Sequence, residues 1–150
     1  KKKVVSWLLG PLDAAAPQRL ELGAPAVAMH VGPLDDQPGL DLATLGLDPP
    51  TRALWSWSGE GWVQATASAG PAALDVAGGD LDGDGWPDLL TAGPQGLAVH
   101  GGFAGPALGA AFVIVDEPAS SIEVRHLDED ATPDLVLADP PRVVVRLASP

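Results

Sequence analysis

Four aspartates stand close together within residues 79–93, which read GDLDGDGWPDLLTAG. Asp80, Asp82 and Asp84 occupy alternate positions, and Asp88 stands four residues after Asp84. No Lys or Arg lies within the stretch, so a divalent cation is the natural partner for these carboxylates. Calcium takes about six to eight oxygen ligands at ~2.3–2.6 Å. The spacing therefore predicts a calcium-binding loop.

The spacing also predicts which atoms would bind the ion. Counted from the first aspartate, the ligand positions one, three, five, seven and nine are Asp80, Asp82, Asp84, the backbone carbonyl of Trp86, and Asp88. Gly85 lies where such a loop must turn sharply, and glycine adopts a positive φ without steric cost. An EF-hand shares the first half of this pattern but needs a Glu at position twelve between two helices. Thr91 holds that position here, so we reject the EF-hand.

The acidic pattern occurs twice more in the chain. Residues 32–46 read GPLDDQPGLDLATLG and residues 125–139 read RHLDEDATPDLVLAD. Each matches the central stretch at seven of fifteen positions, at spacings of 47 and 46 residues respectively. A repeat of this length is typical of solenoids and propellers.

The third copy keeps part of the ligand set. It has carboxylates at positions three, five and nine and a threonine at position seven: Asp128, Asp130, Asp134 and Thr132. His126 replaces the first ligand and Ala131 replaces the turn glycine. Histidine is a poor calcium ligand and alanine resists a positive φ, so we expect at most weak calcium binding in this loop.

The first copy keeps still less of it. Pro33 holds the first position and Gln37 the fifth, which leaves only Asp35 and Asp41 as ligands. We expect this loop to be a metal-free turn, with Asp36 as a solvated surface charge.

Short apolar runs surround each acidic loop. Before the loops, apolar residues alternate with others, as in Val27, Met29 and Val31, or in Ile122 and Val124. A period of two over a short run predicts a β-strand with one buried face. Up to three more apolar runs follow each loop, and 34 Gly and Pro residues separate the runs. Four short strands in an antiparallel meander are typical of one propeller blade.

The predicted fold is all-β, with about three β-propeller blades. The boundaries that we predict are a partial blade over 1–23, blades over 24–70 and 71–118, and a partial blade over 119–150. Trp55 and Trp57 alternate with serines and so share one face of a strand. We expect them to pack between blades, with a sugar-stacking platform as the alternative.

The central loop also carries a family resemblance. The run DLDGDGWPDLL, preceded by a strand of small residues, resembles the FG-GAP and VCBS repeats of calcium-bearing β-propellers, including those of integrin α-chains. Residues 54–70, LWSWSGEGWVQATASAG, resemble a strand–turn–strand segment of bacterial members. The resemblance covers roughly residues 24–150. It implies one calcium ion between the first and second strands of a blade, and loops that bind proteins or sugars.

Composition excludes several classes of protein. The net charge of −12 argues against nucleic acid and anionic membrane surfaces as partners. No apolar run approaches the ~20 residues of a membrane-spanning helix. The chain has no Cys, and His30, His100 and His126 lie far apart without metal-ligand spacing. No nucleophile signature of the Gly-x-Ser-x-Gly kind is present, so we do not expect an enzyme.

The function that we expect is a non-catalytic, calcium-binding propeller module that acts as a binding or adhesion scaffold for a protein or glycan ligand. We expect it outside the cytoplasm, either extracellular or at a periplasmic or cell surface, where calcium is abundant enough to fill weak sites. One alternative is a lectin. Another is the non-catalytic part of a larger secreted enzyme.

Assembly is a further expectation. Propellers close with about four to eight blades, more than the sequence predicts for this chain. Two copies joined head to tail as a homo-oligomer could close a ring, with strands from both chains in a shared blade. The same pattern is expected of a piece of a longer propeller.

Overall fold

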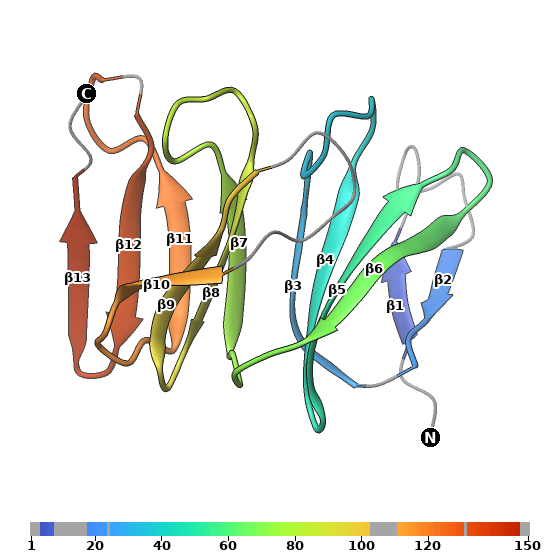
Figure 1. Cartoon of the computed structure of the whole chain (residues 1–150), viewed down its shortest axis with the longest axis horizontal. Coiled ribbons are helices and arrows are strands. Elements are labelled where there is room, and N and C mark those ends of the chain that lie inside the picture. The colour runs from blue at the N-terminus through green and yellow to red at the C-terminus, as the bar shows by residue number, and fades with distance from the viewer. Residues whose placement is uncertain (1–3, 8–17, 24, 103–110, 131, 148–150) are drawn as a thin grey trace.

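The computed structural model describes residues 4–7, 18–23, 25–102, 111–130 and 132–147. All regular secondary structure among these residues is β, and none of them forms a helix that could cross a membrane. The strands form four antiparallel sheets, and each sheet is built from strands that are consecutive in the sequence (Figure 1).

The four sheets follow the chain from one end of the array to the other. The first sheet holds β1 (Val4–Trp7) and β2 (Gln18–Glu21). The second holds β3 (Ala26–Gly32), β4 (Asp41–Leu47), β5 (Pro50–Trp57) and β6 (Trp62–Ala69). The third holds β7 (Asp75–Gly79), β8 (Asp88–Gly93), β9 (Gly96–His100) and β10 (Ala111–Val115). The fourth holds β11 (Ser121–Arg125), β12 (Asp134–Asp139) and β13 (Arg142–Arg146).

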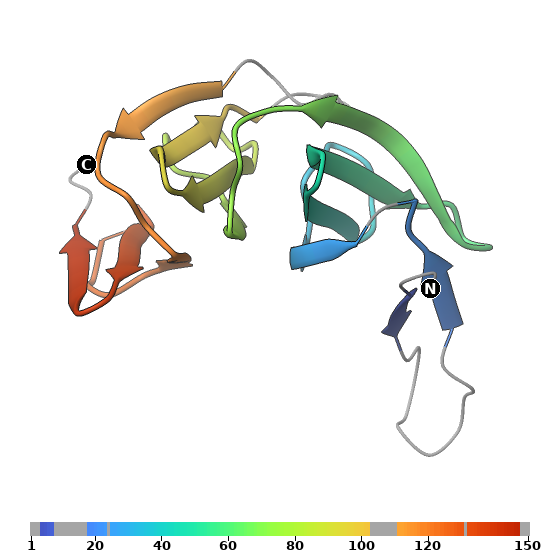
Figure 2. The ribbon, with the colours of Figure 1, turned by 90° about the horizontal axis from the view of Figure 1, so that it is seen from below.

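The two four-stranded sheets are simple meanders, which is the architecture of a propeller blade. The sheets stand side by side along an arc, with β6 and β10 on its convex side (Figure 2). The first strands of neighbouring sheets, β3, β7 and β11, contact one another in turn. The predicted fold class, all-β with propeller blades, is confirmed.

The hydrophobic core lies between the sheets, where one blade face packs on the next. Leu45 and Leu54 of the second sheet meet Val76 of the third, and Leu90 and Leu97 of the third belong to a cluster with the fourth. Leu90 and Leu97 are completely buried. Their burial stabilises the fold by roughly 1.5–3 kcal/mol for each large side chain.

The buried face of β3 was predicted wrongly. Val27, Met29 and Val31 remain 46%, 51% and 51% exposed. The half-buried residues of this strand lie on its other face, where Ala28 packs against the cluster shared with β7. The reason is the neighbouring sheet. Among the described residues, Leu20 of β2 packs against β4 and β5, and its cluster includes no residue of β3.

Polar contacts also join neighbouring sheets. Oδ2 of Asp75 on β7 accepts hydrogen bonds from Ser121 Oγ at 2.7 Å and from the Ile122 amide at 3.0 Å. These contacts hold the first strand of the fourth sheet against the third. In the buried interface between the second and third sheets, the Arg52 guanidinium contacts the His100 ring. Burial lowers the pKa of Arg52.

Of the two tryptophans predicted to pack between blades, Trp55 is shown to do so, whereas Trp57 contacts Trp62 of its own sheet. Trp55 is buried in a cluster with Leu20 and Leu42, and its indole N–H donates to Thr44 Oγ1 at 3.1 Å. The rings of Trp57 and Trp62 meet edge to face, with centroids 5.5 Å apart. Burial therefore leaves little of the Trp55 ring accessible to a ligand.

Candidate metal centre

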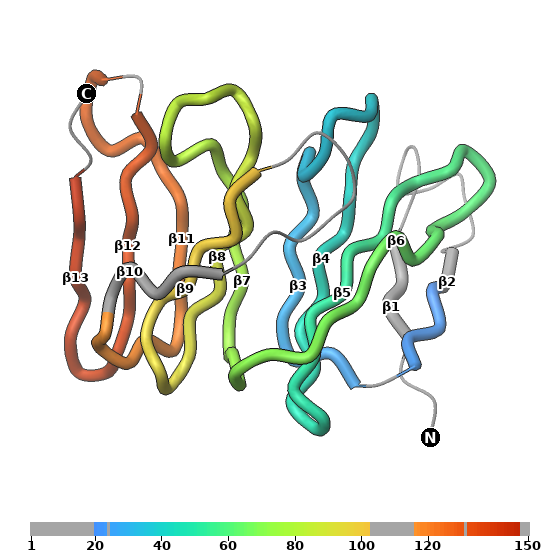
Figure 3. The backbone as a smooth tube through the Cα atoms, viewed as in Figure 1, coloured from blue at the N-terminus to red at the C-terminus, as the bar shows by residue number. Residues whose placement is uncertain are grey.

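The aspartate-rich loop joins β7 to β8. It lies at the same edge of the array as the β3–β4 and β11–β12 loops, which carry the other two copies of the pattern (Figure 3). Antiparallel pairing places it there, because Gly79 and Asp88 face each other as the last pair of the β7–β8 ladder. The ladder thus fixes both ends of the loop.

Asp80 organises the turn of this loop. Its Oδ1 accepts a hydrogen bond from the Gly83 amide at 2.8 Å, and its Oδ2 accepts one from the Gly85 amide at 2.9 Å. Gly83 and Gly85 both have a positive φ, of 74° and 90°. The sharp turn predicted at Gly85 is confirmed. Each carboxylate oxygen still has lone-pair capacity for a further partner.

Three carboxylates converge in the loop. Asp80, Asp82 and Asp88 each offer an oxygen, and these atoms all lie within 4.8 Å of one another. Two ligands that bind one cation at ~2.4 Å can be at most about 4.8 Å apart, so the spacing suits a single calcium ion. The donor set is also suitable, because it consists of hard oxygens. This cluster could hold a cation.

Asp88 is the buried member of the three. It is 3% exposed, and its carboxylate accepts hydrogen bonds from the Leu81 amide at 2.9 Å and the Gly102 amide at 2.8 Å. Burial raises the pKa of Asp88, and repulsion from Asp82 and Asp84 raises it further. The hydrogen bonds from the two backbone amides act in the opposite direction and lower the pKa. A cation beside Asp88 would stabilise its charged form.

The remaining predicted ligands lie on the exposed part of the loop. Asp82 Oδ1 accepts from the Asp84 amide at 3.1 Å, and Asp84 Oδ1 accepts from the Trp86 amide at 2.8 Å. These two Asx turns wind the loop around the cluster. Asp84 and Trp86 themselves do not belong to the group of converging carboxylates.

The third copy keeps most of this scaffold. Asp128 accepts from the Asp130 amide at 3.0 Å, Asp130 from the Thr132 amide at 2.9 Å, and Asp134 from the Leu127 amide at 2.7 Å. Each bond repeats one in the central loop, 46 residues earlier. The described residues of this loop do not form a metal-sized group of carboxylates. Ala131, at the predicted turn, lies outside the described residues.

The first copy retains only two of these hydrogen bonds. Asp35 Oδ1 accepts from the Gln37 amide and Asp41 Oδ2 from the Leu34 amide, both at 2.8 Å. Asp36 is exposed, as expected for a solvated charge. Its Oδ1 accepts a hydrogen bond from Gln37 Nε2 at 2.7 Å. In all three copies the ninth-position aspartate accepts a hydrogen bond from the backbone amide of the second-position leucine, and we call this bond the aspartate clamp. The clamp was not predicted. The recurrence of aspartate at this position in every copy is the sequence signal that could have revealed it.

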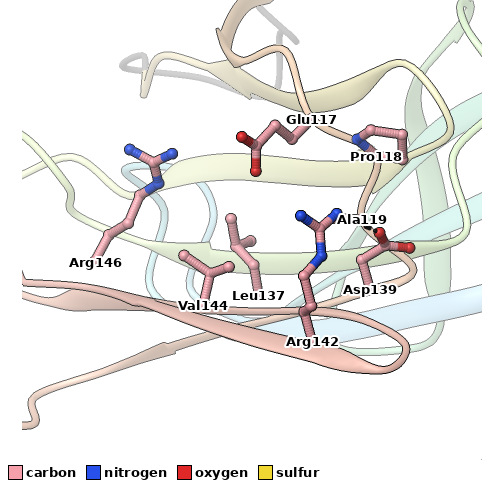
Figure 4. A pocket seen from close by; sticks show the side chains of 8 residues that line it. All are labelled: Glu117, Pro118, Ala119, Leu137, Asp139, Arg142, Val144 and Arg146. Carbon is pink, nitrogen blue, oxygen red and sulfur yellow. Dashed lines mark hydrogen bonds and ion pairs between the residues drawn. The ribbon is translucent and has the colours of Figure 1, made fainter.

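A small cavity of about 20 Å³ lies elsewhere, on the fourth sheet (Figure 4). Arg142 and Arg146 line it together with Glu117. The Arg142 guanidinium forms a salt bridge with the Asp139 carboxylate at 3.2 Å. This volume suffices for about one water molecule and is too small for a substrate. It is separate from the aspartate-rich loop.

Comparison with known proteins identifies the part of the chain that contains the loop. Residues 72–113 match the family model of the FG-GAP repeat. This segment is similar to an FG-GAP repeat. It begins just before β7, contains the whole candidate metal centre and ends within β10. The predicted resemblance is thus confirmed for the FG-GAP repeat itself. No curated protein and no solved structure matches the chain.

Proposed function

We propose that this chain is a non-catalytic β-propeller module that binds calcium in the β7–β8 loop of its FG-GAP repeat. The observation that carries the proposal is the convergence of Asp80, Asp82 and Asp88 within 4.8 Å. In the proposed site Asp84 and the carbonyl of Trp86 complete the oxygen ligands. The third loop, with Asp128, Asp130, Thr132 and Asp134, binds calcium weakly or not at all.

The proposed role of the ion is structural. It neutralises carboxylates that otherwise repel one another, and it fixes the loop between the first two strands of the blade. Catalysis would need an open coordination position with a base or nucleophile beside it. The described residues around the loop supply carboxylates that can bind an ion, and backbone amides whose hydrogen bonds form the turn. We therefore propose a binding scaffold without an activity of its own.

The proposed setting is outside the cytoplasm. Extracellular calcium modules bind with Kd values on the order of 10⁻⁴–10⁻³ M, and such sites fill where calcium is abundant. A lectin and the non-catalytic part of a secreted enzyme remain the alternatives. The burial of Trp55 argues against a lectin that stacks sugars on that tryptophan.

Calorimetric titration with calcium tests the proposal. We expect the wild-type chain to bind one ion strongly enough to detect at millimolar calcium. At a calcium concentration of ~100 times Kd, the free energy of unfolding should rise by about 2.7 kcal/mol. Asp80→Asn should abolish most of this gain. It weakens one ligand and also the acceptor of the two glycine amides.

Asp36→Asn is the matched control, because it removes the same charge from an exposed aspartate of the first loop. It should leave calcium binding unchanged. Asp128→Asn should also leave binding at the central loop unchanged, because Asp128 belongs to the third loop. A folded wild-type chain that binds no calcium at millimolar concentration contradicts the proposal.

A further inference from the structure

Two Asp–Gly peptide bonds lie in the β7–β8 loop, at Asp82–Gly83 and Asp84–Gly85, and the sequence contains no other Asp–Gly pair. An aspartate before glycine isomerises readily, because glycine has no side chain to shield its backbone nitrogen. All four residues are exposed. A Cβ built on either glycine meets no atom within 4 Å, so there is room for a ring to form at both bonds. The loop therefore contains two positions that are chemically open to isomerisation.

The reaction rearranges the backbone. The glycine nitrogen attacks Cγ of the preceding aspartic acid, an N–C bond forms, and the amide proton leaves with the carboxyl hydroxyl group as water. The resulting five-membered succinimide then takes up water at either of its two carbonyl carbons. One route restores aspartate, and the other gives isoaspartate, in which the main chain runs through the former side-chain carboxyl group. The net composition is unchanged, and no oxidant or cofactor is needed.

The attacking nitrogens are both bonded to a third carboxylate in the folded chain. The Gly83 amide donates to Asp80 Oδ1 at 2.8 Å, and the Gly85 amide donates to Asp80 Oδ2 at 2.9 Å. A backbone nitrogen attacks only after it gives up its proton, and a hydrogen bond to a carboxylate stabilises the protonated amide. One side chain, Asp80, thus restrains the nitrogens of both Asp–Gly bonds.

The carboxyl groups that would be attacked are restrained as well. Asp82 Oδ1 accepts from the Asp84 amide at 3.1 Å, and Asp84 Oδ1 accepts from the Trp86 amide at 2.8 Å. Each carboxylate is therefore bonded to the nitrogen two residues ahead and not to the glycine nitrogen that directly follows it. Both reacting groups have other partners, so the loop must open locally before either bond can react.

We propose that Asp82 and Asp84 are sites of spontaneous isomerisation, and that Asp80 suppresses the reaction in the folded chain. This role of Asp80 does not depend on a bound ion. The consequence for the loop rests on the proposed function. Isoaspartate adds one carbon atom to the main chain and removes it from the side chain, so an isomerised Asp82 no longer brings its carboxylate to those of Asp80 and Asp88. Isomerisation therefore ends calcium binding at the proposed site.

Incubation of the folded chain at neutral pH in EDTA tests the role of Asp80 without calcium. Peptide mapping by mass spectrometry measures isoaspartate at each aspartate, and the same chain unfolded in guanidinium chloride gives the unprotected rate. We expect the folded wild type to isomerise at Asp82 and Asp84 about tenfold more slowly, the factor for opening one charge-assisted hydrogen bond. Asp80→Ala should remove most of this difference.

Two controls accompany this measurement. Asp36→Ala should leave both rates unchanged, because Asp36 is an exposed aspartate of the first loop. Asp128 is the internal control, because its Asx turn at 3.0 Å matches the one of Asp82 at 3.1 Å, but Glu129 follows it in place of a glycine. We expect far less isoaspartate at Asp128 than at either Asp–Gly bond.

Three outcomes would overturn the proposal. They are equal rates in the folded and unfolded wild type, an unchanged rate in Asp80→Ala, and as much isoaspartate at Asp128 as at the Asp–Gly bonds. The first comparison needs no variant, so it holds even if Asp80→Ala does not fold.

Calcium titration of fresh and incubated wild type tests the consequence for the metal loop. The fraction of chains that has lost calcium binding should equal the fraction isomerised, and full binding by isomerised chains would refute that consequence. A fresh chain that binds no calcium would instead contradict the proposed function, and the rates measured in EDTA would still decide the role of Asp80.

Discussion

The Asp88 carboxylate accepts a hydrogen bond from the Leu81 amide at 2.9 Å, across seven residues of the loop. The same link joins Asp41 to Leu34 and Asp134 to Leu127. It therefore occurs in a loop with a metal-sized carboxylate group and in two loops without one among the described residues. The ninth-position aspartate thus closes the loop in all three copies, and the proposed metal binding of the central copy would be an additional function of Asp88.

The clamp gives a prediction for the loop that lacks the ligand set. Asp41→Ala leaves the amide of the buried Leu34 without its acceptor, so the free energy of unfolding should fall by roughly 1–3 kcal/mol. Asp41→Asn keeps an acceptor oxygen and should recover part of the loss. Urea denaturation in EDTA measures both. Asp36→Ala, at an exposed aspartate, should change stability little, and an equal effect at both positions would refute the clamp.

The turn of the metal loop gives a second prediction. Gly85 has a φ of 90°, in the left-handed region that residues with a Cβ avoid. Gly85→Ala should therefore destabilise the chain by roughly 1–2 kcal/mol and weaken calcium binding. Gly61→Ala is the control, because a Cβ there meets open space and the residue has no positive φ. Thermal unfolding with and without calcium separates the two effects.

His30 gives a prediction for the pH dependence of stability. Its ring packs against β7, since a Cβ on Gly78 would lie 2.8 Å from Nε2 of the ring. Burial lowers the pKa of His30 below its ordinary value of about 6.5. The unfolded chain then binds the proton more tightly than the folded chain. The contribution of His30 to stability is therefore full above pH ~6.5 and is lost as the pH falls below it.

The test compares the free energy of unfolding at about pH 7.5 with that at about pH 5.5. His30→Gln should lose less stability between these values than the wild type, and His126→Gln, at an exposed histidine, should behave like the wild type. An unchanged pH dependence in His30→Gln would count against the packing of a neutral ring at this position.

Exposed apolar side chains on the second and fourth sheets give a fourth prediction. Met29 is 51% exposed, whereas Val76 and Ile122, at the same position of the next two sheets, are 5% and 4% exposed. Val143 is 67% exposed, whereas Leu97, its counterpart in the third sheet, is fully buried. Apolar positions that are buried elsewhere in the array are thus exposed on β3 and β13. We expect copies of the chain to associate through them.

Sedimentation velocity over a range of concentrations measures this association. Met29→Lys and Val143→Lys should each weaken it, while Leu40→Lys, at an exposed leucine before β4, should not. A chain that stays monomeric at the highest concentrations would rule out the predicted head-to-tail assembly.

The sequence by itself determined the blades and the central loop. A period of two in short apolar runs, and a repeat of 46 to 47 residues, predicted antiparallel strands in blade-sized meanders. The spacing of Asp80, Asp82, Asp84 and Asp88, with glycine at 85, predicted the turn and a cluster of carboxylates, and the first two of these converge with Asp88. These features depend on residues that are close in the chain, so the local sequence determines their conformations.

Only the tertiary structure decided which faces are covered and which residues meet across blades. The alternation in β3 fixes two faces, but the neighbouring sheet determines which one is buried, and Met29 lies on the uncovered one. Asp75 and Ser121 are 46 residues apart and meet only because β7 packs beside β11. Burial and such contacts depend on the placement of whole sheets, and the local pattern of residues contains no information on that placement.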